Sequence, residues 1–433
     1  WRAQKVDLAN YSRRWSYVGT TALAADPKAR PYNNIKTGLK LPRWQTSDFF
    51  GGGSAGKFPA TPALWQEDMY FFEANKFSGT RSLSEEVTAG YLMAQGSLGR
   101  DGWLGRTGYL TGVRTEKTDT EGEGWVLVRA NVRSTTAQQL ADPVGAARRN
   151  YESAARVTNG SYTKSFPSAH LTHDFTRNLK ARLSWSTSFG RPGIGNLLPS
   201  ESANENAQTV TINNPGLLPQ MAKNWDFTLD YYFEPVGNFS VGWFNKKIKD
   251  YIVTGTNAGI VESGTDNGYN GEYAGFTRLT SSNSGTATVD GWEFSYRQQF
   301  TFLPGLLQGL SGSANYTVID TKGNFGGTTN RKTGQVPNFI PKAGNVSLSW
   351  RYRGFSTRVL YNYTGDYISS YNATNAGGNL YRYAFKTTNV GLAYQLRPSV
   401  SLTCDVANIF NKPQRLYQGV PGRTQDIMYN YIT

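Results

Sequence analysis

The sequence is poor in the residues that form covalent or metal cross-links. Its 433 residues include one cysteine, Cys404, and two histidines. A single cysteine excludes an intramolecular disulfide and a cysteine-based metal cluster. The chain also lacks any apolar run of the roughly 18 residues that a membrane-spanning helix requires. A helical membrane protein is therefore excluded, whereas a membrane β-barrel is not.

The first residues lack the features of a signal peptide. Trp1-Arg2-Ala3 contains neither a starting methionine nor an apolar core. We therefore expect the chain to begin inside a longer protein, either as a processed form or as one part of it.

The chain is basic, with a formal net charge of +14, but its Lys and Arg residues are scattered. They form only short clusters such as Arg13-Arg14 and Lys246-Lys247. We therefore predict no nucleic-acid partner. A surface that faces anionic lipid or lipopolysaccharide accounts for the excess charge equally well.

Aromatic residues are abundant, although only 38% of the chain is hydrophobic. There are 26 Tyr, 22 Phe and 11 Trp. Low hydrophobicity is typical of disorder, but disordered chains contain few aromatic residues. The chain must therefore fold in a way that gives many large rings a specific place.

Apolar and polar residues alternate with a period of two from about residue 87 to the end, which predicts an all-β fold. Helical periodicity is scarce, and the Ala/Arg-rich segment near residues 143–157 is the best helix candidate. The large side chains that alternation assigns to one face of the strands, here called the apolar face, include Leu179, Leu183, Trp185, Trp225, Phe227, Leu229, Trp292, Phe294, Val346, Leu348, Trp350, Leu402 and Val406.

Short and long connections alternate between these strands. Tight turns are predicted at residues 176–178, 234–238, 353–354 and 397–399. Long loops rich in Gly, Asn, Ser and Thr are predicted at residues 191–222, 254–287, 321–342 and 366–385. In an up-and-down meander, alternate connections lie at the same end of the sheet. One end therefore has tight turns and the other has large loops.

This asymmetry, with strands of about ten residues, predicts a large antiparallel transmembrane β-barrel. Lipid cannot satisfy an open sheet edge, so a sheet that crosses a membrane must close. The apolar face would then contact acyl chains, and the polar face would line a wet lumen. A soluble β-sandwich or propeller is the alternative, which the regular connections and the bulky aromatic face disfavour.

The number of strands indicates the large end of the barrel range. Hairpins counted back from the C-terminus give about thirteen strands, of which the last begins near Gln425. The first 86 residues and residues 119–160 are expected to add a few more. Barrels of 22 strands have a plugged lumen.

Five segments resemble motifs of the TonB-dependent receptors, and they occur in that family's order. They are SWSTSFGRPGIGNLLP (Ser184–Pro199), NNPGLLPQMAKNWDFTLDYYF (Asn213–Phe233), GWFNKKIKDYI (Gly242–Ile252), TVDGWEFSYRQQF (Thr288–Phe300) and VANIFNKPQRLY (Val406–Tyr417). Each motif is loose by itself, but the five together cover roughly the C-terminal half of a typical receptor.

The resemblance implies a barrel of about 22 strands in the outer membrane of a Gram-negative bacterium, with short periplasmic turns and long extracellular loops. It implies active import of a bulky, scarce nutrient: an iron–siderophore complex most often, otherwise cobalamin or an oligosaccharide. The implied partners are outer-membrane lipid and lipopolysaccharide, the transported ligand, and the TonB motor, which acts through a plug domain.

The sequence departs from the family pattern in several places. Gln220 stands where the family often has Glu, and no plug domain or TonB-contacting box is recognisable. The chain stops at Tyr431-Ile432-Thr433, before the terminal aromatic residue that is usual in the family. We therefore expect residues 1–433 to be a partial barrel domain, without the plug and the first strands and with a truncated last strand.

Ligand contact is expected from aromatic and arginine side chains in the long loops, because these suit an aromatic chelator, an anionic siderophore or a sugar face. The alternative is that these side chains pack the loops together or belong to an aromatic girdle. The candidates are Tyr269, Tyr273, Phe276 and Arg278 in one loop and Tyr371, Tyr381 and Arg382 in another.

Other candidate sites are weak. His170 and His173 are three residues apart on a strand and would point to opposite faces, so we predict no metal site there. Cys404 is interpreted as a small apolar residue on the lipid side. Paired carboxylates such as Glu121 and Glu123 are interpreted as exposed or lumen-lining groups.

The sequence also lacks the patterns of catalysis. No Ser-His-Asp set is apparent, and the glycine-rich residues 264–275 lack the lysine and the strand–helix frame of a phosphate loop. We predict neither a cofactor nor an enzymatic activity. A passive porin and a structural or adhesion barrel remain the functional alternatives, and an outer-membrane enzyme is a weaker one.

Overall fold

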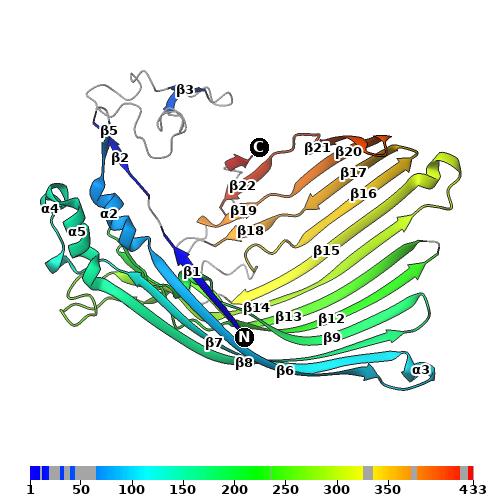
Figure 1. Cartoon of the computed structure of the whole chain (residues 1–433), viewed down its shortest axis with the longest axis horizontal. Helices are drawn as coiled ribbons and strands as arrows, with labels where there is room; N and C mark the ends of the chain where they lie inside the picture. Colours follow the sequence, from blue (N-terminus) through cyan, green and yellow to red (C-terminus); the bar gives the residue numbers. More distant parts are fainter. Residues whose placement is uncertain are drawn as a thin grey trace.

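The computed structural model describes residues 1–9, 12–18, 30–33, 40–43, 65–234, 236–324, 335–371, 378–419 and 428–432. Its main feature is one large curved sheet (Figure 1). Within the described residues this sheet has 15 strands, and its main path follows the order β1-β6-β7-β8-β9-β12-β13-β14-β15-β16-β17-β20-β21. Every neighbouring pair on that path is antiparallel. The all-β antiparallel prediction is confirmed.

The strands of the main path range from 7 to 24 residues. They are β1 (Arg2–Leu8), β6 (Arg81–Ser97), β7 (Thr107–Trp125), β8 (Ala155–Asp174), β9 (Leu179–Gly190), β12 (Gln220–Phe233), β13 (Gly237–Ile260), β14 (Thr277–Gln299), β15 (Leu310–Asn324), β16 (Lys342–Tyr352), β17 (Phe355–Thr364), β20 (Phe385–Arg397) and β21 (Val400–Val406).

Short strands and helices make up the remaining elements. The strands are β2 (Trp15–Tyr17), β3 (Arg30–Asn33), β4 (Lys40–Arg43), β5 (Trp65–Glu67), β10 (Glu201–Asn204), β11 (Thr209–Ile212), β18 (Tyr367–Ser370), β19 (Leu380–Arg382), β22 (Gln414–Gln418) and β23 (Met428–Ile432). The helices are α2 (Met69–Ser78), α3 (Gly102–Gly105), α4 (Thr136–Ala141), α5 (Pro143–Tyr151) and α6 (Ile194–Leu197), with 3-10 turns η3 (Ala130–Val132), η4 (Glu152–Ala154) and η5 (Gly305–Gly309). No described helix is long and apolar enough to cross a membrane.

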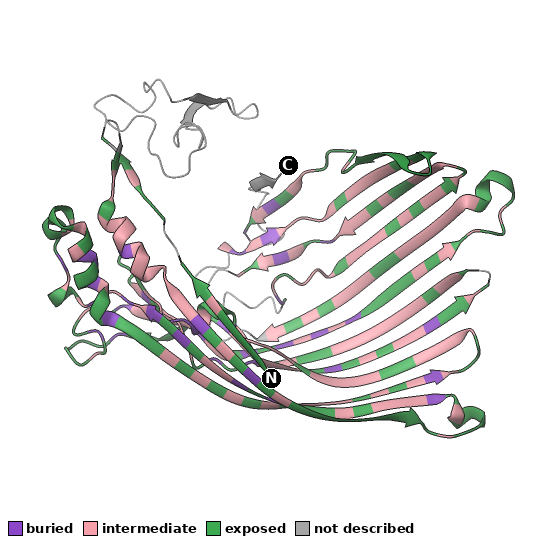
Figure 2. Ribbon diagram, viewed as in Figure 1, coloured by how far each residue is buried: buried purple, intermediate pink, exposed green. Residues whose placement is uncertain are grey.

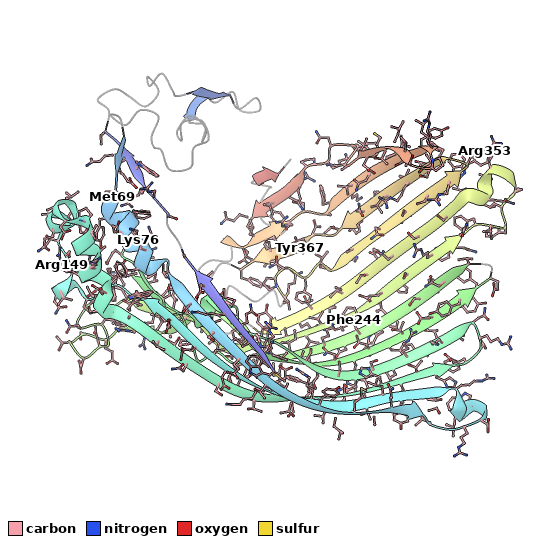
Figure 3. The ribbon with its side chains drawn as sticks, viewed as in Figure 1. Met69, Lys76, Arg149, Phe244, Arg353 and Tyr367 are labelled. Atoms are coloured by element: carbon pink, nitrogen blue, oxygen red, sulfur yellow. The ribbon has the colours of Figure 1, made fainter. Side chains whose placement is uncertain are left out.

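The predicted alternation of connections is confirmed. Short connections join β8 to β9, β12 to β13, β16 to β17 and β20 to β21 at the right of Figure 1, here called the turn end. Long connections lie at the opposite end, here called the loop end. Figure 3 shows Arg353, which has a positive φ of 52°, at the turn end and Tyr367 at the loop end. A positive φ is typical of tight hairpin turns.

Helices α2, α4 and α5 lie at the loop end, whereas α3 lies at the turn end (Figure 1). The predicted helix near residues 143–157 is confirmed as α5, with Pro143 in its first turn and the Asp142 Oδ1 atom accepting a hydrogen bond of 2.9 Å from the Gly145 amide. Helix α2 was not predicted. The Asp68 side chain accepts from the Phe71 amide at 2.8 Å and caps its N-terminus. Figure 2 shows most buried residues at the loop end.

Three predictions about the elements were wrong in detail. The expected loop at 254–287 is shorter, because β13 continues to Ile260 and β14 begins at Thr277. Residues 119–160 add no further strand; they extend β7 and β8 and form helices between them. Strand β23 pairs with β22 in a separate four-stranded sheet, β18-β19-β22-β23, rather than joining the main path, although the expected start near Gln425 lies outside the described residues.

The end of β21 lies where alternation breaks in the sequence. The strand stops at Val406, and Asn408 has a positive φ of 49°. The Asn408 Oδ1 atom accepts from the Lys412 amide at 3.0 Å, and its Nδ2 atom donates to the Lys412 carbonyl at 3.0 Å. Asparagine tolerates this left-handed conformation better than most residues because it can bond locally in this way.

Candidate functional site

The two faces of the sheet differ sharply in chemistry. Residues directly opposite each other in antiparallel strands have side chains on the same face, so the register identifies the members of each face. Trp185 is opposite Trp225, Phe227 is opposite Trp243, and Trp243 is opposite Trp292. The same pairings run on through Val346 to Val406. All thirteen residues predicted for the apolar face therefore share one face of the sheet.

This apolar face is open in the structure. Leu402 is 60% exposed, Val346 is 55% exposed, and Trp225 is 45% exposed. Large apolar side chains left exposed in a contiguous patch indicate a surface that another apolar phase or molecule covers. That the covering phase is lipid stays a prediction.

The opposite, polar face carries ion pairs. Asp230, only 7% exposed, accepts a hydrogen bond of 2.7 Å from the Ser240 hydroxyl and pairs with Arg182 across the strands. Nearer the loop end, Arg191 reaches Glu116 at 3.1 Å and Glu85 at 3.4 Å. These pairs stabilise neighbouring strands and place fixed charges on the polar face.

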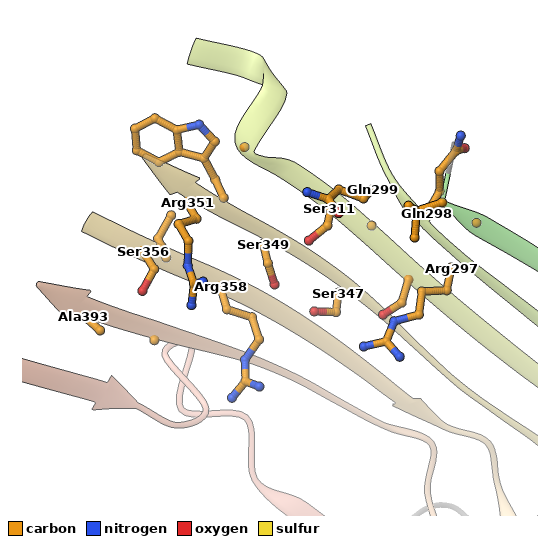
Figure 4. A pocket seen from close by; sticks show the side chains of 18 of the residues that line it. Arg297, Gln298, Gln299, Ser311, Ser347, Ser349, Arg351, Ser356, Arg358 and Ala393 are labelled. Carbon is orange, nitrogen blue, oxygen red and sulfur yellow. The ribbon is translucent and has the colours of Figure 1, made fainter. Parts of the chain in front are cut away.

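A hollow of about 980 Å³ opens on the polar face towards the turn end. Residues from β13 through β21 line it, so these strands curve around it. Figure 4 shows Arg297, Arg351 and Arg358 extending from the strands, among the serines of β15 to β17. Asp405 is the carboxylate of this lining. The hollow is therefore hydrophilic and carries a positive charge that could hold an anionic group.

The first predicted group of ligand-contacting residues is brought together at the loop end. Tyr269, at 7% exposure, and Phe276, at 9%, are buried with Val210 and Val261, and Tyr273 packs against them. The rings of Tyr269 and Tyr273 are 5.4 Å apart, and those of Tyr273 and Phe276 are 5.6 Å apart. Burial raises the pKa of both tyrosines above its usual value. These rings join the loop segments, and ligand contact by them stays a prediction.

Arg278 differs from its predicted partners because it lies in strand β14 rather than in a loop. Its Nη2 atom donates to the Ala258 carbonyl at 3.0 Å. Its Nε atom is buried and has no hydrogen-bond partner among the described residues. A buried donor without a partner is costly.

Ion pairs clamp the loops around this group. Arg129 pairs with Glu201 through both guanidinium nitrogens, at 2.5 and 2.9 Å, and its guanidinium lies 5.0 Å from the Tyr269 ring. The hydrogen bond to Glu201 raises the pKa of Arg129. Arg133 reaches Glu272 at 3.4 Å. Residues 126–154, strand β10 and the β13–β14 loop are thereby tied together.

The second predicted group lies apart from the first. Tyr371 packs beside Val253 and Val336, and its hydroxyl donates to the Gln335 carbonyl at 2.7 Å. Tyr381, at 5% exposure, stacks on Tyr417 with ring centroids 5.1 Å apart. Arg382 lies in β19 opposite Leu416. Tyr371 and Tyr381 thus have different neighbours, and the structure does not bring the seven predicted residues into one site.

The two histidines for which we predicted no metal site both lie on strand β8. His173 bonds to the Thr107 hydroxyl at 2.7 Å between the rings of Trp103 and Phe175. His170 points to the other face of β8, as the strand period requires. In the part of the chain that the structure describes, no three His, Cys, Asp or Glu side chains gather as metal ligands would.

The sequence did not predict the residues of the ion pairs that tie the loops together, Arg129, Arg133, Glu201 and Glu272. It also did not predict the ion pairs of Arg191 with Glu85 and Glu116. Only Arg191 had a signal, since it lies in the quoted segment Ser184–Pro199. The clamps join residues up to 142 positions apart, and no local pattern reports such pairs.

Solved structures with a similar fold are receptors and transporters of ferric complexes. The ferric-catecholate import receptor Fiu of Escherichia coli is 16% identical, with a TM-score of 0.55 over 78% of this chain and 42% of that one. The ferric enterobactin receptor of Pseudomonas aeruginosa, in complex with enterobactin, is 16% identical, with a TM-score of 0.54 over 82% and 51%. The unliganded ferric citrate transporter FecA is 14% identical, with a TM-score of 0.53 over 87% and 46%.

At these identities the likeness shows the fold, which is that of TonB-dependent β-barrels. The chain spans about half the length of these structures. No curated protein sequence matches the chain. The family model described as "TonB dependent receptor-like, beta-barrel" matches residues 1–409. The chain therefore belongs to the TonB-dependent receptor β-barrel family.

Proposed function

We propose that this chain is the barrel portion of a receptor that imports an iron–siderophore complex across the outer membrane of a Gram-negative bacterium. In this proposal the apolar face contacts lipid, the polar face lines the lumen, and the loop end faces outward. A plug segment elsewhere in the complete gene product would contact TonB, whose motor supplies the energy. The chain itself has the role of a receptor and transporter rather than an enzyme.

One observation carries this proposal most directly: Arg278 and its aromatic neighbours lie at the loop end, beside a polar face that runs the length of the sheet. Arg278 lies in β14 at this end, and the half-buried Tyr273 packs against the buried rings of Tyr269 and Phe276. Guanidinium and phenol groups suit the anionic, aromatic chelators of ferric iron. The sheet then provides a hydrophilic wall from this point to the hollow at the turn end.

The test is uptake of radioactive iron by a strain in which the complete gene is deleted and then restored. Ferric complexes of a catecholate and of citrate are supplied separately. We expect the restored gene to support uptake of one complex, and we expect uptake to stop when the proton motive force is dissipated. Uptake that persists without that force would instead identify a passive porin, and absence of uptake with any ferric complex would refute iron import.

Residue-level tests use the same strain. Arg278→Ala removes a charge-assisted hydrogen bond, which contributes about 1.5–3 kcal/mol, so we expect ligand affinity to fall roughly 10- to 100-fold. Arg177→Ala, in an exposed turn at the opposite end, is the matched control and should leave affinity unchanged. Equal effects of the two substitutions would contradict a ligand site at Arg278.

A further inference from the structure

Lysines on the apolar face are confined to one end of the sheet. On five strands a lysine lies two or four residues beyond a large apolar residue of this face, towards the loop end. On β12, Lys223 follows Trp225, and on β13, Lys247 follows Trp243. The other members of the set are Lys322 after Val318, Lys342 after Val346 and Lys386 after Val390. All five lysines are exposed.

The turn end of the same face has no such set in the described strands. Its last side chains are aromatic: Phe233 stacks on Tyr296, and Trp350 stacks on Tyr352. The basic residues of that end, such as Arg182 and Arg297, lie on the polar face. Lysines that only anchor a barrel in the membrane would be found at both membrane interfaces. Confinement to one end indicates that the leaflet at the loop end is the more anionic.

The densest part of this set lies on β12 and β13. Lys223 is directly opposite Lys247, and Lys249 is two residues further along on the same face. Opposed residues have Cβ atoms about 4.5–5.5 Å apart, and like charges at that position are destabilising. None of the three lysines forms an ion pair in the described structure. By register, the nearest carboxylate is Asp290, diagonal to Lys247.

The positions of these lysines along their strands match the depth of lipid headgroups. A strand rises about 3.3 Å per residue, so the Lys223 backbone lies about 7 Å beyond Trp225 and the Lys247 backbone about 13 Å beyond Trp243. Tryptophan rings mark the interface between the acyl chains and the headgroups. Three ammonium groups just beyond that level suit the phosphates of a lipid better than a ligand in the lumen.

The side-chain charge at the loop end of the apolar face changes sign around the sheet. On β6 and β7 the charged residues of the same face beyond the apolar band are mostly acidic and include Glu86 and Glu121. Lys117 also lies there but is paired with Asp119 at 2.9 Å. An anionic lipid would therefore be attracted to β12 and β13 and repelled from β6 and β7, which makes the contact a local site rather than a uniform belt.

We propose that Lys223, Lys247 and Lys249 together bind the phosphate groups of a phosphorylated glycolipid in the leaflet at the loop end. This inference rests on the outer-membrane placement in the proposed function, but not on the identity of the transported ligand. The bound phosphates offset the repulsion between Lys223 and Lys247. The lipid then becomes part of the structure of the β12–β13 hairpin.

The test compares two variants of the complete receptor, purified in mild detergent. Lys223, Lys247 and Lys249 are changed together to Gln in the first variant. Lys246→Gln is the matched control, because Lys246 is exposed on the same strand but shares the polar face with Asn224. Binding of purified lipopolysaccharide and of its dephosphorylated form is measured by native mass spectrometry, and heat-resistant gel migration confirms that each barrel is folded.

Each basic side chain near an anionic surface changes the binding constant roughly fivefold, so the triple variant should bind on the order of 100-fold more weakly. Wild type and Lys246→Gln should bind lipopolysaccharide equally and the dephosphorylated form weakly. Three results would overturn the proposal: unchanged binding by the triple variant, an equal loss in Lys246→Gln, or equally strong competition by inorganic phosphate alone, which would indicate a general anion site.

A second variant keeps the test decisive if the triple variant folds poorly. Lys223→Glu places opposite charges across the two strands, so it should raise the unfolding temperature in lipid-free detergent while it weakens lipopolysaccharide binding. Lysines with a purely structural role would not separate these two effects. Iron uptake is measured in parallel to separate the two proposals. Loss of lipid binding with normal iron uptake is a result about the lipid site alone. Absence of iron uptake in the wild type would refute only the proposed transport.

Discussion

Val346 and Asn345 are adjacent on β16 and test the assignment of the two faces. Val346 lies on the apolar face opposite Ala314 and Tyr361, in the middle of the apolar band. Asn345 lies on the polar face opposite Asn315 and Asn362. Neither residue is beside a charged side chain in its register. Val346→Arg and Asn345→Arg therefore introduce the same side chain, at the same depth, into two different environments.

The expected difference follows from the cost of placing a charge in lipid. Arginine on the lipid face of a barrel costs about 2–4 kcal/mol near the bilayer midplane. The Asn345 Oδ1 atom accepts a hydrogen bond of 3.0 Å from the Asn315 Nδ2 atom at an exposed site, and loss of this bond costs about 1 kcal/mol or less. We therefore expect Val346→Arg to be less stable than Asn345→Arg by at least about 1–3 kcal/mol.

The assay is equilibrium unfolding of the complete receptor in phosphatidylcholine vesicles, followed by tryptophan fluorescence over a urea series. Abundance of the folded form in outer membranes, seen as heat-modifiable gel migration, provides a cellular readout. The reasoning is refuted if the two substitutions destabilise equally, or if Asn345→Arg is the more harmful. Either result would mean that lipid does not cover the apolar face.

Other predictions concern the loop end and the strand ends. Glu201→Gln should cost about 1.5–3 kcal/mol of loop stability by weakening the bidentate pair with Arg129, and limited proteolysis of whole cells should then cut the loops faster; Glu205→Gln, an exposed control without an ion pair, should not. Asn408→Ala should cost about 1–2 kcal/mol, because alanine is disfavoured at positive φ, and Asn408→Gly should recover part of the loss in urea unfolding; equal instability would exclude a backbone cause. Gly291→Ala should reduce folded yield, because a Cβ atom there would lie 2.4 Å from a carbonyl oxygen of β15, and a normal yield would show that the strands can separate locally.

The sequence predicted the fold well where each strand has one apolar and one polar face. On β9, β12 and β16 the predicted apolar residues all share one face, because a period of two leaves no other arrangement for an extended chain. The tight turns were also predictable, since they interrupt the alternation for only a few residues. Strand β21 and its end at Val406 followed from the same signal.

The functional clusters could not be predicted in the same way. Arg129 and Glu201 are 72 residues apart, and Tyr269 lies beside Arg129 only in the folded chain. The sequence indicated which residue types suit a ligand, and three of the residues it selected, Tyr269, Tyr273 and Phe276, lie together in the structure. It gave no indication that Tyr269 and Phe276 are buried within the cluster while Arg278 keeps an unpaired donor.

The error in the 254–287 loop has a physical cause that bears on function. A 24-residue strand such as β13 spans about 80 Å, far more than a tilted crossing of an apolar band of about 25 Å requires. Beyond that band both faces are wet, so the alternation disappears although the strand continues. Arg278 lies in this extension and is held by backbone pairing with Val210. A ligand at Arg278 would therefore meet a fixed wall rather than a mobile loop, and recognition there would depend on the shape of that wall.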